Sequence, residues 1–169
     1  MAKPKLIVFD LDYTLWPFWI DTHVDPPFKK KSDGRIHDRN GQRIKFYSCV
    51  PDILQRLQNE GYQLGVASRT GATAEANELL ILFDWDKYFA YKEIYPGSKT
   101  THFARFLKNS GLQYQDMLFF DDEHRNIIEV RNLGVTCILA EDGVTEEVIQ
   151  RGFKQYAQDR NQNQSTSAL

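Results

Sequence analysis

Cysteine is scarce in this sequence: its 169 residues include only two, Cys49 and Cys137, which lie far apart. So few cysteines exclude a disulfide-stabilised scaffold and are typical of a reducing compartment. Long apolar runs are also missing, since no stretch approaches the roughly 20 residues that a membrane-spanning helix needs. The chain enters its first expected strand at Lys5, which leaves no room for a signal peptide. We therefore expect a cytoplasmic protein without a membrane partner.

The sequence also lacks an excess of charge of either sign. Its net charge is −2, and its one basic cluster, residues 29–31, is most simply a solvated loop, so we expect no nucleic-acid partner. The four histidines and two cysteines show no metal-ligand spacing, which argues against zinc. Apolar residues make up 41% of the chain, enough for a buried core, and nothing requires more than a monomer.

Short apolar runs alternate with helical patterns along the chain. The runs predict strands near residues 5–9, 62–67, 88–94, 117–120 and 135–139. The segments between and after them predict helices near residues 50–60, 71–83, 99–109, 124–133 and 145–158. This alternation predicts an α/β fold with a doubly wound, mainly parallel, Rossmann-like sheet. Residues 1–158 are expected to form a single domain, followed by a flexible polar tail over 159–169.

A small flap is predicted over about residues 17–48. Asn40-Gly41 is a strong signal for a two-residue hairpin turn, here between strands near residues 35–38 and 43–47. No gap between the expected elements is long enough for a cap domain. We therefore expect an open site, roofed only by the hairpin and by the aromatic loop 16–19, with at least one of Trp16, Phe18 and Trp19 lining the pocket.

Polar residues gather just after the expected strands, at the edge where open α/β sheets bind ligands. They are Asp10 and Asp12 after the first strand, Ser68 and Arg69 after the second, Lys99 at the start of the helix after the third, and Asp121 and Asp122 after the fourth. Singly, each has an ordinary structural explanation: Ser68 or the acidic pair could cap a helix, and Lys99 could be an exposed surface lysine. Together they predict one site.

The residue types in this cluster indicate phosphoryl chemistry. Carboxylates that face one another repel unless a cation lies among them, and ligands that are all oxygens favour Mg²⁺. Ser68, Lys99 and the free N–H groups of the helix start after Ser68 are donors suited to phosphate oxygens. A carboxylate, Mg²⁺ and a phosphate cradle together suggest in-line attack by an aspartate on phosphorus, through an aspartyl-phosphate.

Four short motifs resemble those of phosphatases of the haloacid dehalogenase (HAD) superfamily. Asp10-Leu11-Asp12-Tyr13-Thr14 after an apolar strand is similar to the first motif, Asp-x-Asp-x-(Thr/Val). Ser68 resembles the second motif, Lys99 the third and Phe119-Phe120-Asp121-Asp122 the fourth. The motifs occur in the family's order, between residue 5 and about residue 140. The resemblance implies a HAD core that carries the small flap and no cap domain.

The resemblance also implies roles for the acidic residues. Asp10 would be the nucleophile that becomes phosphorylated. Asp12 would protonate the leaving alcohol and then activate water. Mg²⁺ would be held by Asp10, by the backbone carbonyl of Asp12 and by the side chain of Asp122, with Asp121 as the less favoured ligand.

The same resemblance implies a phosphate ester as substrate. Ser68 and Lys99 would bind the phosphoryl group, and Arg69 would reach the substrate. The ester could be a small molecule, such as a sugar phosphate or a phosphorylated glycated amine, or a phosphoprotein with a phosphotyrosine-like group. The sequence leaves these alternatives open.

Other phosphoryl functions fit the residues less well. A cysteine phosphatase needs an arginine six residues after its cysteine, and neither Cys49 nor Cys137 has one. A phosphomutase usually needs a cap to exclude water. The main alternative is a receiver-type phospho-acceptor module, which keeps its phosphoryl group without turnover. Its acceptor aspartate would end the third strand, where this chain has Glu93-Ile94.

Overall fold

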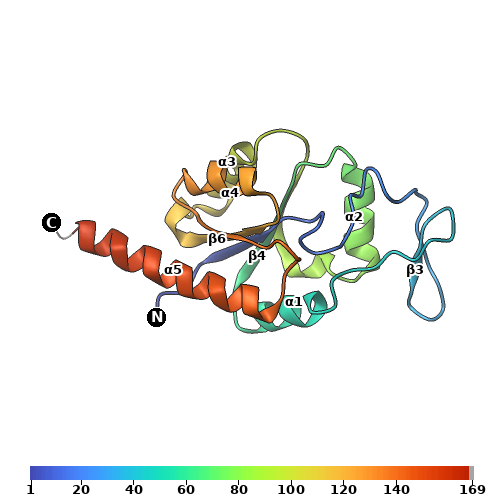
Figure 1. Ribbon diagram of the computed structural model, residues 1–169, viewed down its shortest axis with the longest axis horizontal. Coiled ribbons are helices and arrows are strands. Elements are labelled where there is room, and N and C mark those ends of the chain that lie inside the picture. The colour runs from blue at the N-terminus through green and yellow to red at the C-terminus, as the bar shows by residue number, and fades with distance from the viewer. Residues whose placement is uncertain (168–169) are drawn as a thin grey trace.

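A five-stranded parallel sheet forms the centre of the molecule (Figure 1). The computed structural model describes residues 1–167, with side chains up to residue 163. Every neighbouring pair of strands is parallel, in the order β5-β4-β1-β6-β7. The bounds are β1 Leu6–Phe9, β4 Gln63–Ser68, β5 Phe89–Ile94, β6 Met117–Asp121 and β7 Thr136–Leu139. The five expected strands are therefore all present, and β1 lies in the middle of the sheet.

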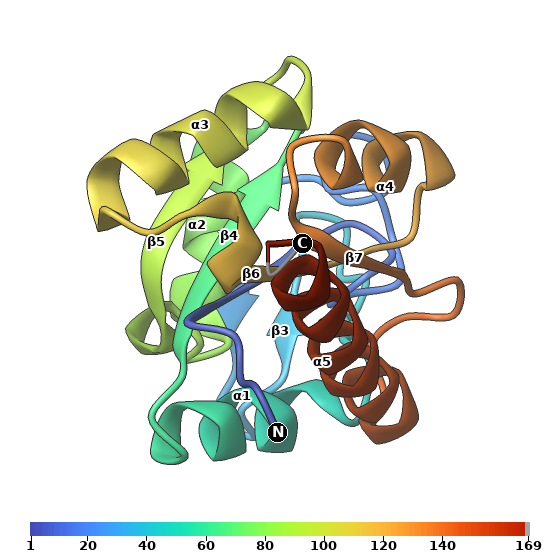
Figure 2. The same ribbon diagram turned by 90° about the vertical axis from the view of Figure 1, so that its left-hand side faces the viewer.

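Helices cover both faces of the sheet, which confirms the doubly wound architecture (Figure 2). Helices α3 and α4 pack on one face, and α1, α2 and α5 pack on the other. Short 3₁₀ helices, η1 Asp86–Tyr88 and η2 Tyr114–Asp116, lead into β5 and β6. The bounds of the α-helices are α1 Val50–Asn59, α2 Thr73–Leu82, α3 Lys99–Ser110, α4 His124–Arg131 and α5 Glu146–Ser167.

Strand β1 is buried on both faces. Leu6 and Val8 pack in the core beneath α3 and α4, whereas Ile7 and Phe9 pack in the core on the opposite side. Successive side chains of a strand point to opposite faces, so a continuous apolar run suits a central parallel strand. Burying such side chains stabilises the fold by about 1.5–3 kcal/mol each. This anchoring fixes the position of Asp10, the residue that follows the strand.

A cap on α3 fixes the position of Lys99. The Ser98 hydroxyl accepts a hydrogen bond from the Thr100 N–H, so Ser98 is the N-cap and Lys99 the first residue of the helix. Gly111 ends the helix in the left-handed conformation, with φ 73°. These bounds agree with the prediction. Helix α2, by contrast, starts at Thr73 rather than near residue 71, because Ala72 has a non-helical ψ of 57°.

The hairpin differs from its prediction. Its paired strands are β2 Lys29–Lys30 and β3 Ile36–His37, joined by a turn at residues 31–35 in which the Asp33 side chain accepts the Arg35 N–H. The Asn40-Gly41 turn also forms, with a bridge between His37 and Arg43 and backbone hydrogen bonds from Asp38 N–H to the Gln42 carbonyl and from Ile44 N–H to the Ile36 carbonyl. The buried Asp38 carboxylate also accepts the N–H groups at positions 40 and 42 of this turn. The hairpin projects from the end of the molecule opposite the termini (Figure 1).

Helix α5 continues to Ser167, well past the predicted end at residue 158. Asp159, the first residue of the expected tail, accepts hydrogen bonds from Thr136 Oγ1 and Gln155 Nε2, each at 2.8 Å. The Thr136 contact ties the helix to β7, a long-range interaction that the local sequence does not reveal. Flexibility over 159–169 stays a prediction, and residues 168–169 lie outside the described part of the chain. Among the described residues, no helix has the length and apolar character to cross a membrane.

Candidate active site

A cavity of about 420 Å³ opens at the edge of the sheet where the strands end. It brings together five of the predicted site residues, Asp10, Asp12, Ser68, Arg69 and Lys99. The other residues that line it are Trp19, Asp21, Thr22, Thr70, Glu123, Arg125 and Asn126. Asp121 and Asp122 do not line this cavity but lie beside Asp10, as described below.

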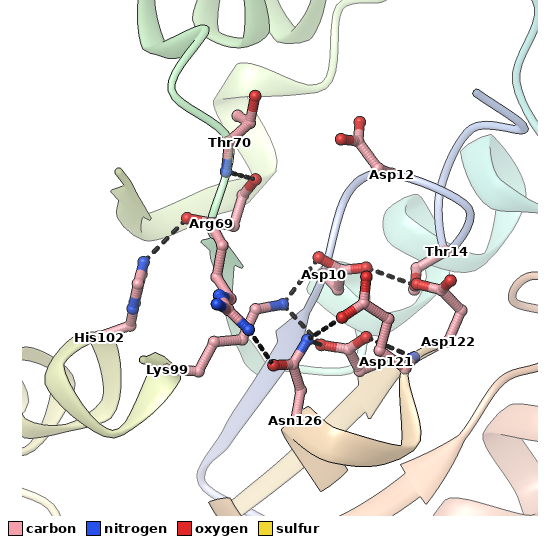
Figure 3. A network of polar contacts seen from close by, with 12 residues as sticks. Asp10, Asp12, Thr14, Arg69, Thr70, Lys99, His102, Asp121, Asp122 and Asn126 are labelled. Carbon is pink, nitrogen blue, oxygen red and sulfur yellow. Dashed lines mark hydrogen bonds and ion pairs between the residues drawn. The ribbon is translucent and has the colours of Figure 1, made fainter. Parts of the chain in front are cut away.

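Both oxygens of the Asp10 carboxylate are held by buried donors (Figure 3). The Lys99 ammonium donates to Oδ1 at 2.7 Å, and the Thr14 hydroxyl donates to Oδ2 at 2.9 Å. Thr14 and Lys99 are almost completely buried, while Asp10 is 7% exposed, at the floor of the cavity. The carboxylate therefore has a fixed orientation and remains open toward the cavity.

Asp121 orients Lys99 from behind. It is completely buried, and its Oδ2 accepts from Lys99 Nζ at 2.6 Å and from the Asn126 amide at 3.0 Å. Its Oδ1 accepts the Glu123 N–H at 2.9 Å. Lys99 thus bridges two carboxylates, Asp10 and Asp121, and a 1% exposed lysine cannot be the surface residue that a single lysine would suggest.

Asp10, Asp121 and Asp122 form a cluster able to hold a metal ion. One carboxylate oxygen from each lies within 4.8 Å of the others. Asp121 already accepts three hydrogen bonds from neighbouring residues, whereas the bond that the Thr14 hydroxyl donates to Asp122 is long, at 3.3 Å. The spare oxygen capacity of the cluster therefore lies on Asp10 and Asp122, and oxygens of this kind are the ligands that Mg²⁺ prefers.

Burial makes the carboxylates of the site hard to ionise. It raises the pKa of Asp10 to about 7, partly opposed by the Lys99 ammonium. Burial and the nearby charge of Asp10 raise the pKa of Asp121 to about 6, and burial also raises the pKa of Asp122. Burial would lower the pKa of Lys99, but the carboxylates of Asp10 and Asp121 outweigh it and raise that pKa. The site therefore has more negative charge than Lys99 alone neutralises, which fits a bound cation.

The Asp12 carboxylate is held by a tryptophan. Its Oδ1 accepts the Trp16 indole N–H at 2.7 Å and the Ile20 backbone N–H at 3.2 Å. Trp16 is itself completely buried and stacks on Phe18. Burial raises the pKa of Asp12, and these two hydrogen bonds partly offset the rise. A carboxyl with a raised pKa on the cavity wall is suited to carry a proton.

Trp19 is the residue of the aromatic loop that lines the cavity. Its side chain is 48% exposed, whereas Trp16 and Phe18 belong to the core. The expectation that at least one of these rings lines the pocket is confirmed. The expected roof is only half right, because no residue of the hairpin 29–44 is among the described residues that line the cavity. The hairpin instead contacts α2, where Lys30 donates to the Leu82 carbonyl.

Ser68 and Arg69 extend from the end of β4 into the cavity wall. The Ser68 hydroxyl accepts the Thr70 N–H at 3.2 Å in a local turn, but it does not cap α2, whose N-cap is Ala72. Arg69 Nη1 donates to the Asn126 side-chain oxygen at 3.2 Å. Because Asn126 also donates to Asp121, it connects the arginine to the buried end of the charge network.

Sequence reasoning missed three residues of this network. Thr14 belongs to the first motif, so its position there was the available signal. Trp16 had only its place in an aromatic loop, and nothing local indicated that its N–H would hold Asp12. Asn126 follows the acidic pair by a few positions and carried no distinguishing signal, since its role depends on contacts with Arg69 and Asp121.

Comparison with known proteins places the chain in a family. The model of the family described as Acid Phosphatase matches residues 2–159. The chain belongs to this acid phosphatase family. It is 54% identical over 158 residues to human Magnesium-dependent phosphatase 1, and the alignment covers 93% of this chain and 90% of the human protein. It is 48% identical over 144 residues to a HAD-like hydrolase superfamily protein of Schizosaccharomyces pombe, over 79% of this chain and 83% of that protein.

Solved structures support the same fold for this acid phosphatase family member. A HAD-superfamily hydrolase of Geobacter sulfurreducens, 14% identical, aligns with a TM-score of 0.60 over 84% of this chain and 92% of that one. The N-terminal phosphatase-domain part of BF1531 from Bacteroides fragilis, complexed with Mg, is 18% identical and aligns with a TM-score of 0.58, over 83% of this chain and 37% of that one. The predicted relationship to HAD phosphatases is confirmed, and the receiver alternative is not favoured.

Proposed function

We propose that the protein is a magnesium-dependent phosphomonoester hydrolase that acts through a phospho-aspartyl intermediate on Asp10. One observation carries the proposal: the Asp10 carboxylate faces the cavity with one oxygen held by Lys99 and the other by Thr14. This orientation suits attack on a phosphoryl group bound in the cavity, because a positioned nucleophile avoids the entropy cost of a bimolecular encounter.

The reaction takes place in two displacements. An Asp10 oxygen forms a bond to phosphorus while the ester P–O bond breaks, and Asp12 gives its proton to the leaving alcohol. A water then attacks phosphorus and loses a proton to Asp12, while the aspartyl P–O bond breaks to release phosphate and restore Asp10. Ser68 and Lys99 bind the phosphoryl oxygens, and Arg69, the residue after Ser68, reaches the substrate.

The residues for a magnesium site are Asp10, Asp122 and the backbone carbonyl of Asp12. Asp122 is preferred over Asp121, because the three donors on Asp121 already use its oxygens to orient Lys99. The bound ion would offset the negative charge of the carboxylates and of the phosphate. The name of the human relative, Magnesium-dependent phosphatase 1, and the Mg complex of the Bacteroides protein support this cofactor.

EDTA should abolish hydrolysis of p-nitrophenyl phosphate, and added Mg²⁺ should restore it. Full activity in EDTA would contradict the metal requirement.

The bound metal should also change the way in which the stability of the folded protein depends on pH. The pKa of Asp10 is about 7 in the folded protein, against 3.8 for a free carboxyl. Without metal, the contribution of Asp10 to the free energy of unfolding is therefore fully present below about pH 3.8 and is lost as the pH rises to about 7. Mg²⁺ should therefore raise Tm more at pH 8 than at pH 5.

The Asp12→Asn variant should separate the two displacements. Hydrolysis of an alkyl phosphate, whose leaving group needs a proton, should slow by about 10²–10⁴-fold. With p-nitrophenyl phosphate the first displacement should survive, since p-nitrophenolate leaves without a proton, and aspartyl-phosphate should accumulate as a burst in rapid-quench measurements. The matched control is Asp21→Asn, a neighbouring carboxylate that also lines the cavity. Unchanged kcat in Asp12→Asn would refute the acid–base role.

The substrate stays a choice between phosphotyrosine-like groups on proteins and small sugar phosphates. The cavity lies open beside the exposed Trp19 ring, and the hairpin does not close it, so either class could enter. A panel of phosphate esters and phosphopeptides ranked by kcat/KM decides between them.

A monomeric state and a cytoplasmic location are further predictions, which gel filtration and cell fractionation test.

A further inference from the structure

His102 is a buried histidine that the proposed mechanism does not use. It lies in the first turns of α3 and is completely buried. Its Nε2 lies 2.8 Å from the Ser68 carbonyl oxygen and 2.8 Å from the Tyr95 carbonyl oxygen. Its Nδ1 lies 3.2 Å from the Ser98 carbonyl oxygen. In Figure 3 the dashed line from His102 reaches the chain beside Arg69.

These partners come from the segments that carry the phosphate-binding side chains. Ser68 ends β4, Tyr95 follows β5, and Ser98 caps the helix that begins with Lys99. Carbonyl oxygens only accept hydrogen bonds, and Nε2 lies closer to its two carbonyls than Nδ1 lies to that of Ser98, so we assign the ring hydrogen to Nε2, which shares it between two carbonyls. Burial lowers the pKa of His102, which favours this neutral ring. The Tyr95 ring stacks on the imidazole at 4.3 Å and restricts its rotation.

The contact with Ser68 has a direct consequence for the cavity wall. The Ser68 carbonyl is held by the imidazole and also accepts the Tyr95 N–H at 3.1 Å. A trans peptide is planar, with its C=O and N–H pointing in opposite directions. Fixing this carbonyl therefore fixes the Arg69 N–H, which points away from His102, and limits the movement of the Ser68 side chain that precedes it.

We propose that His102 is a positioning residue for phosphoryl binding, which fastens the Ser68-Arg69 segment to the start of the helix that carries Lys99. It touches neither the substrate nor Asp10. Its N–H holds two backbone segments in register, so that Ser68 and Lys99 approach one phosphoryl group from fixed positions. The inference rests on the proposed phosphatase function. It adds a residue that has no place in the four motifs and lies outside the lining of the cavity.

Two substitutions separate the hydrogen bond from the bulk of the ring. His102→Leu fills the space without a donor, whereas His102→Gln places an amide N–H near the position of Nε2. The readout is the inhibition constant of orthophosphate and of vanadate, together with KM and kcat for p-nitrophenyl phosphate. We expect His102→Leu to weaken both inhibitors and raise KM by about 10–100-fold, since small misplacements of binding groups have effects of this size. His102→Gln should stay close to wild type, because its amide N–H can donate to the same carbonyls.

Phe103→Leu is the matched control for loss of packing. Phe103 is the next residue of α3, is completely buried, and packs among apolar side chains on that face of the sheet. It should lower Tm and leave the inhibition constants unchanged. Unchanged inhibition constants in His102→Leu, or an equal rise of these constants in Phe103→Leu, would overturn the positioning role of His102. The proposed phosphatase function would still stand if the wild-type protein hydrolysed phosphate esters. A wild-type protein that neither hydrolyses esters nor binds orthophosphate would overturn both proposals.

Discussion

Replacement of Asp10 by asparagine should abolish phosphate ester hydrolysis. The amide keeps the size of the side chain but cannot form the aspartyl-phosphate, so kcat for p-nitrophenyl phosphate should fall by at least about 10³-fold. The fold should survive, because burial already disfavours the charge at this position and raises its pKa to about 7. Steady-state kinetics and circular dichroism on the same preparation measure both effects. Mass spectrometry after acid quench should find phosphate on wild type and none on the variant.

A buried aspartate outside the site gives the matched control for Asp10→Asn. Asp38 is 6% exposed and accepts N–H groups of Asp25, Asn40 and Gln42 in the hairpin loop. Asp38→Asn makes the same chemical change and should lower Tm, but kcat should stay near the wild-type value. Full activity of Asp10→Asn, or equal losses in both variants, would remove Asp10 from the mechanism.

The position of the site could be predicted from the sequence because it depends on local patterns. An apolar run long enough for a buried strand ends at Asp10, and Ser98 followed by a helical pattern places Lys99 at the start of α3. The strand order, which only the structure shows, brings the ends of β1 and β4 together. The same reasoning found the fold class, since every expected strand of the sheet is present.

The connections within the site could not be predicted in the same way. Lys99 reads as an ordinary lysine until the fold places Asp10 and Asp121 beside it. The division of labour between Asp121 and Asp122 follows from donors on other segments, including the Asn126 amide. The pairing of β3 with β2 likewise was not predicted, since the sequence analysis paired residues 35–38 only with residues 43–47.

Replacement of Lys99 by methionine should remove activity and much of the stability. The ammonium bridges Asp10 and Asp121 at 2.7 and 2.6 Å, and its loss leaves two buried carboxylates without their cation. Breaking a buried ion pair from one side costs about 3–5 kcal/mol, so urea unfolding should show a loss of that order. Phosphate binding should weaken as well, because Lys99 is proposed to contact the phosphoryl oxygens. The exposed Lys87, paired with Asp84, is the control: Lys87→Met should leave kcat unchanged.

The way in which the stability loss of Lys99→Met depends on pH and on Mg²⁺ distinguishes an effect of charge from an effect of packing. Without the lysine the carboxylates gain more from protonation, so the Lys99→Met variant should be destabilised less at pH 5 than at pH 8, and Mg²⁺ should recover part of the loss at pH 8. Adding Asp121→Asn removes the second buried charge and should restore stability without restoring hydrolysis. A loss that is independent of pH, unaffected by Mg²⁺ and not reduced in the double variant would mean that Lys99 contributes packing alone. A loss that depends on pH and is reduced by Mg²⁺ and by Asp121→Asn would mean that Lys99 stabilises the protein through its charge, which balances Asp10 and Asp121 together with the metal ion.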